Sequence, residues 1–72
     1  MYKLVGKGKV CGEKYEETML AKNDYDTKYI LRLRYMCWKQ MGKDYTAECN
    51  WFSNVATVNG PDTDATLKAK EV

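Results

Sequence analysis

The residues of this chain that could do chemistry are three cysteines and a scatter of carboxylates, because the sequence contains no histidine. Cys11, Cys37 and Cys49 show no CxxC spacing. Zinc requires four nitrogen or sulfur ligands, or three and a water, and an odd number of cysteines does not indicate a disulfide framework. We therefore expect no metal site, and three structural thiols in the reducing cytoplasm.

Catalysis is not expected either. The commonest general base is missing, and a cysteine nucleophile would need an activating base or a cationic neighbour. The acidic residues that come into question are Glu13, Glu16, Glu17 and Asp24. Turns and solvated surfaces explain them, although the strand register described below turns Glu17 toward the apolar face. The sequence thus predicts a protein that is not an enzyme and holds no cofactor.

Large and basic side chains in the middle of the chain have the composition of a binding surface, since Trp, Arg and Met are enriched in protein interfaces. The predicted interaction face consists of Ile30, Arg32, Arg34, Met36, Trp38 and Phe52. Its first candidate partner is another protein, including a second copy of the chain. Its second is a single strand of nucleic acid stacked on Trp38 and Phe52. Against both stands the interpretation that this face binds nothing, because the C-terminal segment or curling of the sheet covers it.

Residues 27–38, TKYILRLRYMCW, are the stretch that must position most of this face. Apolar residues recur there at every second position, namely Tyr29, Leu31, Leu33, Tyr35 and Cys37. A period of two is typical of a strand with one buried face. A helix is the alternative, because Lys28, Arg32 and Lys39 also fall at helical spacing and Gly42 could act as a cap.

The following segment favours the strand. Residues 40–42, QMG, place glycine third, as a three-residue hairpin loop with a bulge requires. With that loop Leu33 falls opposite Cys49, and Arg34 falls opposite Glu48. Extending the pairing to residues 14–22 also brings Glu16 beside Arg34. The two carboxylates would cancel much of the field of Arg34, which argues against a bound phosphate.

The N-terminal part of the chain reads as a hairpin. Residues 2–11 alternate lysines with apolar residues, as in a charge-guarded edge strand. Gly6 and Gly8 fall on the inward face, where a large side chain could lie across the backbone. Gly12 and Glu13 suit a two-residue turn into the second strand, residues 14–22.

Residues 62–72 have two interpretations. Pro61, two early acids and two late lysines fit a short helix and its dipole. The alternation of Ala65, Leu67 and Ala69 with polar residues fits a fifth strand, which we favour. The predicted fold is therefore mainly β: an antiparallel meander of residues 2–11, 14–22, 28–38 and 44–52, with a C-terminal strand closing a small curled sheet or barrel. The alternative is α+β with a helix at residues 62–72.

Length and charge limit the function further. Seventy-two residues make one domain, 1–72, and no stretch approaches the ~20 apolar residues of a membrane span. A net charge of +2 is small for a protein dedicated to nucleic acid. We expect a small cytoplasmic binding or regulatory protein, such as an inhibitor, that contacts another protein by a sheet face or edge and can form a homodimer. The alternative is a module that binds single-stranded nucleic acid.

Overall fold

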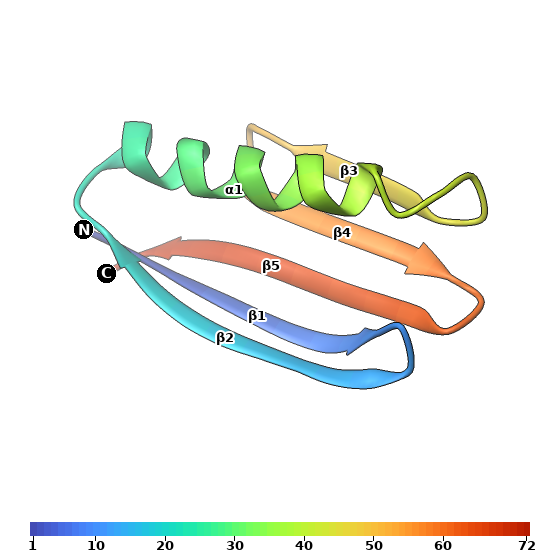
Figure 1. Ribbon diagram of the computed structural model, residues 1–72. Coiled ribbons are helices and arrows are strands. Elements are labelled where there is room, and N and C mark those ends of the chain that lie inside the picture. The colour runs from blue at the N-terminus through green and yellow to red at the C-terminus, as the bar shows by residue number, and fades with distance from the viewer.

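The computed structural model describes residues 1–72 and shows one antiparallel sheet with a helix across one of its faces (Figure 1). The elements are β1 (Tyr2–Val10), β2 (Glu13–Ala21), α1 (Asp24–Lys39), β3 (Thr46–Asn50), β4 (Val55–Gly60) and β5 (Thr63–Glu71). The strand order is β2-β1-β5-β4-β3, so β2 and β3 are open edges and the sheet does not close into a barrel.

This architecture confirms the predicted mainly-β fold and its C-terminal strand. β5 occupies the segment for which a helix at residues 62–72 was the alternative, and its alternate residues Ala65, Leu67 and Ala69 are buried. The prediction that residues 2–11 form an edge strand is wrong. β1 pairs with β2 on one side and with β5 on the other, so its lysines do not guard an edge.

The prediction of a strand at residues 28–38 is also wrong, because these residues belong to α1. Asn23 begins the helix: its side chain accepts a hydrogen bond from the Asp26 N–H at 2.8 Å. Asp24 and Asp26 lie in the first turn and Lys39 in the last, which suits the helix dipole. Asn23, Asp24 and Asp26 are typical turn formers, but here they form the N-terminus of the helix.

The two periodicities in this stretch were hard to separate, because almost every position carries an apolar or long side chain. Thr27, Leu31 and Trp38 are buried, and their spacing of four and seven residues defines one helical face. A strand would bury Leu31 and Leu33 on the same face. In the structure Leu31 is 0% exposed and Leu33 is 49% exposed.

The strand pairings built on residues 28–38 change accordingly. Cys49 pairs with Ala56 and Glu48 with Thr57, so neither faces α1 residues across a hairpin. The predicted strand at residues 44–52 shortens to β3, Thr46–Asn50. Residues 51–54 form a turn, and β4 is a separate strand.

The first hairpin forms as predicted, with its register moved by two residues. Its turn is Cys11–Gly12, with φ values of 52° and 80°, so Val10 pairs with Glu13. Two consecutive left-handed residues are typical of a type I′ turn. A shift of two preserves which side chains share a face. Tyr15 lies across Gly6, as predicted for a large side chain, and a Cβ on Gly6 would be 2.7 Å from its Cζ atom.

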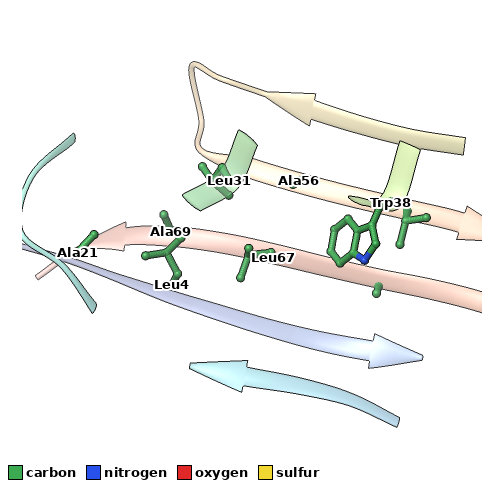
Figure 2. Packing of buried hydrophobic residues seen from close by; sticks show 9 residues of the cluster. Leu4, Ala21, Leu31, Trp38, Ala56, Leu67 and Ala69 are labelled. Carbon is green, nitrogen blue, oxygen red and sulfur yellow. The ribbon is translucent and has the colours of Figure 1, made fainter. Parts of the chain in front are cut away.

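The core lies between α1 and the sheet (Figure 2). Its members are Leu4, Ala21, Leu31, Trp38, Ala56, Val58, Ala65, Leu67 and Ala69. Alanines on β4 and β5 leave room for the helix to approach, and the Trp38 indole points from α1 toward the sheet. α1 is not long and apolar enough to cross a membrane.

Candidate functional site

The residues of the predicted interaction face lie on different sides of α1. Trp38 is only 5% exposed, Ile30 packs against the core, and Arg34 is half-buried. Arg32 and Met36 are exposed on the outer side of the helix. Phe52 is 98% exposed in the turn between β3 and β4. The six residues therefore do not share one face, and Arg32, Met36 and Phe52 are the ones available to a partner.

Arg34 has a structural role instead. Its Nη2 atom lies 2.8 Å from both carboxylate oxygens of Glu17 on β2. Its guanidinium lies 5.9 Å from the Tyr15 ring centroid, and Tyr15 meets Trp38 edge-on at 5.7 Å. Glu17 does turn toward the helix, as its register predicted. The expected grouping of Arg34 with Glu16 and Glu48 does not form, because Glu17 is the partner.

Tyr15 gives this cluster a dependence on pH. Its hydroxyl is buried without a hydrogen-bond partner. Burial raises the pKa of Tyr15 above its usual value, and the neighbouring Glu17 carboxylate raises it further. The folded state thus favours neutral tyrosine. Its contribution to stability is fully present below the unfolded-state pKa of about 10 and is lost as pH rises toward the folded-state pKa.

We predict that Tyr15→Phe removes part of this alkaline sensitivity. At neutral pH the variant should be as stable as the wild type or slightly more so, because an unsatisfied buried hydroxyl is removed. Above about pH 10 its urea midpoint should fall less steeply than that of the wild type. Parallel urea titrations at neutral and alkaline pH measure this difference. Equal losses in both proteins would show that Tyr15 does not contribute.

Five exposed large apolar side chains lie on the outer side of α1 and the neighbouring turn, whereas Met1, Leu20 and Val72 are exposed elsewhere. We call this group the aromatic surface: Tyr25, Tyr29, Arg32, Met36, Trp51 and Phe52. The four helical members are spaced four, three and four residues apart, so they form one stripe. This stripe lies opposite the buried residues Thr27, Leu31 and Trp38.

A hollow of about 470 Å³ separates the N-terminal half of α1 from the turn. Its walls are formed by Asp24, Tyr25, Lys28, Tyr29, Arg32 and Trp51. The Trp51 ring also packs edge-on against Tyr35, with centroids 6.2 Å apart. The helix and the turn thus share a hollow lined by aromatic, basic and acidic side chains, and Met36 and Phe52 are not among its lining residues.

Hydrogen bonds hold the turn in place. The Asn50 Oδ1 atom accepts from the N–H groups of Phe52 and Ser53, each at 3.0 Å. Lys28 Nζ donates to Asn54 Oδ1 at 2.9 Å and to Asp24 at 3.0 Å, which ties the turn to α1. Asn54 adopts φ 58°, a left-handed conformation that asparagine tolerates. Phe52 is therefore presented to solvent by an ordered segment.

The other face of the sheet is open and carries lysines. Lys3, Lys7, Lys9, Lys68 and Lys70 alternate with buried or inward residues of β1 and β5, so they point away from α1. Lys3 lies directly opposite Lys70, an unfavourable pairing of like charges. None of the ion pairs involves these lysines. We call this the lysine face.

The cysteines do not pair. Cys11 and Cys37 are exposed, and Cys49 is half-buried. Burial raises the pKa of the Cys49 thiol, which lowers the fraction of reactive thiolate at neutral pH. No three residues among histidine, cysteine, aspartate and glutamate lie close enough together to hold a metal ion. The aromatic surface is thus the most developed candidate site.

No family model, curated protein or solved structure gives a significant match to this chain. The site therefore has to be interpreted from its own geometry. Tyr25, Tyr29 and Trp51 belong to the surface but were not among the predicted residues. Recognising Asn23 as a helix N-cap would have revealed the two tyrosines, because they share one helical side with Arg32 and Met36.

Proposed function

We propose that this chain is a small non-enzymatic binding or regulatory protein that attaches to another protein through its aromatic surface. The observation that carries the proposal is Phe52, which is 98% exposed although the turn around it is fixed by hydrogen bonds. Exposing so much apolar area is costly in water, and grouped aromatic residues beside arginine are typical of interface hot spots. An ordered anchor also loses little conformational entropy on binding.

The charges of the surface describe the partner. Arg32 is exposed and belongs to no ion pair, whereas Lys28 is already paired with Asp24. The fitting partner offers an apolar pocket for Phe52 and a carboxylate for Arg32. A small protein of this kind acts by occupying a surface, as an inhibitor does. Its three free thiols suit the cytoplasm, which we propose as its compartment.

Binding of single-stranded nucleic acid is the alternative and fits the geometry less well. Such a site combines stacking aromatics with cations that follow the backbone. Here the aromatics lie on α1 and its neighbouring turn, while most lysines point the other way from the sheet. A strand stacked on Tyr29 and Trp51 would meet few cations besides Arg32. Any binding should then show a shallow dependence on salt.

Affinity capture with paired variants tests the proposal. Phe52→Ser and Arg32→Glu alter the aromatic surface, and the matched controls Val72→Ser and Lys7→Glu make the same kinds of change on the opposite face. A partner recovered by the wild type and both controls should be lost with Phe52→Ser. With the purified partner, Phe52→Ser should weaken the dissociation constant by roughly 30-fold or more, as hot-spot residues do.

Arg32→Glu should weaken binding as well, since it places a negative charge opposite the partner's carboxylate. Isothermal titration calorimetry gives the dissociation constant of the purified partner for both variants and both controls. Equal affinities for all four proteins would contradict the proposal. Recovery of nucleic acid alone, with binding that falls as salt rises, would favour the alternative.

A further inference from the structure

β2 is an open edge of nine residues, Glu13–Ala21. Val10 and Glu13 flank the two-residue turn and are a hydrogen-bonded pair, and such pairs alternate along an antiparallel ladder. Tyr15, Glu17 and Met19 therefore bond to β1. The backbone N–H and C=O groups of Lys14, Glu16, Thr18 and Leu20 point outward, free to pair with another strand.

Only the first half of this edge is guarded by charge. Glu13, Lys14, Glu16 and Glu17 lie there, whereas residues 18–21, TMLA, carry no charge and no proline. Such an unguarded edge invites strand pairing. Leu20, which belongs to this uncharged segment, lies on the open face of the sheet and is 64% exposed.

The helix side of the same segment is also apolar. A groove of about 210 Å³ runs between β2 and α1. Met19, Ile30, Leu33, Arg34 and Cys37 line it. The uncharged half of the edge thus has exposed apolar groups on both faces of the sheet, which a second strand could cover.

Going beyond the proposed function, we propose that β2 pairs in antiparallel fashion with β2 of a second copy, with Met19 on the two-fold axis. This register places Thr18 opposite the partner's Leu20, and it brings Glu16 to the partner's Lys22, the first residue after β2. By symmetry each pairing occurs twice. Met19 then lies opposite the partner's Met19, and the two apolar grooves become neighbours.

Charge selects this register from those centred nearby. If Thr18 lies on the two-fold axis instead of Met19, Lys14 falls opposite the partner's Lys22. If Glu17 lies on the axis, it falls opposite the partner's Glu17. Centring on Leu20 brings no charges together. The occupant is a second copy because Glu16 on β2 and Lys22 just beyond its end carry opposite charges, so that each meets its complement in an identical chain. One strand edge and its groove form a small interface, so we expect association at micromolar concentrations.

A charge swap tests the pairing. Sedimentation equilibrium of the full chain should show a reversible dimer, at twice the monomer mass of 8.4 kDa. Glu16→Lys and Lys22→Glu, made singly, should each weaken dimerisation by roughly tenfold or more, since each creates two repulsive pairs. The double variant restores both attractions and should return to within about threefold of the wild type.

Three further variants test whether dimerisation depends on β2 and not on another part of the protein. Thr18→Pro removes an outward N–H and leaves the bonds to β1 intact, so circular dichroism should stay native while the dimer is lost. Glu48→Lys makes the same charge change on the opposite edge strand, β3, and should leave the dimer unchanged. Phe52→Ser should also leave it unchanged, so this test is independent of the aromatic surface. A monomer at all concentrations, or a dimer indifferent to Glu16 and Lys22, would overturn the proposal.

Discussion

Replacing Leu31 with alanine should unfold a large fraction of the protein, whereas the same change at Leu33 should have little effect. Leu31 is 0% exposed between α1 and the sheet, and Leu33 is 49% exposed. Truncating a fully buried leucine costs about 2–5 kcal/mol, because transferred area is lost and a cavity remains. A core of this size supplies only about 3–5 kcal/mol in total. The first variant should therefore lose most of its stability.

The comparison of the two leucines also tests the helix itself. Leu31 and Leu33 are two residues apart, so a strand would bury them together and a helix separates them. Urea unfolding followed by circular dichroism should give a loss below about 1 kcal/mol for Leu33→Ala, as for a partly exposed position. Equal losses for both variants would contradict the position of α1.

Gly8→Ala should be the second severe change. Gly8 has φ 133°, which L residues rarely adopt, and a Cβ there would lie 2.7 Å from the Cα atom of Ala65. That obstacle is the backbone of the neighbouring strand β5, which cannot move without breaking its pairing with β1. Backbone strain and displacement should together cost about 3 kcal/mol or more.

Gly12→Ala is the matched control for this prediction. Gly12 also has a positive φ, 80°, but nothing lies within 4 Å of its added Cβ. The free energy of unfolding should fall by only about 1 kcal/mol in Gly12→Ala, because the substitution strains the backbone conformation but meets no neighbouring atom. Thermal unfolding of the two variants distinguishes strain from steric exclusion. Similar melting temperatures for both would show that β5 does not approach Gly8 as closely as the structure indicates.

The two terminal parts of the fold could be predicted from the sequence because strand alternation is visible in both, although residues 62–72 also carry the early acids and late lysines of a short helix. Along β1 and β5, polar residues alternate with Leu4, Leu67 and Ala69, and a helix would scatter these residues around its circumference. The turn at Gly12 was located to within one residue, and its two-residue length preserved the faces. Local sequence could not tell that β1 is interior, since that depends on pairing with β5, more than fifty residues away.

The middle of the chain could not be assigned from periodicity. In α1 the outward residues Tyr29 and Met36 are as apolar as the inward ones, because they form an exposed surface. A binding surface thus weakens the contrast between faces on which amphipathic patterns depend. The same apolar residues that hid the helix now define the candidate site, together with Trp51 and Phe52 from the turn.

Photo-crosslinking from position 52 tests most directly whether the aromatic surface is occupied by another protein. A photoreactive phenylalanine analogue replaces Phe52, and the control carries it at Thr66 on the lysine face. We predict one discrete crosslinked protein from position 52, absent from position 66 and lost when Arg32→Glu is added. No crosslink from position 52, or the same products from both positions, would contradict a protein-binding aromatic surface.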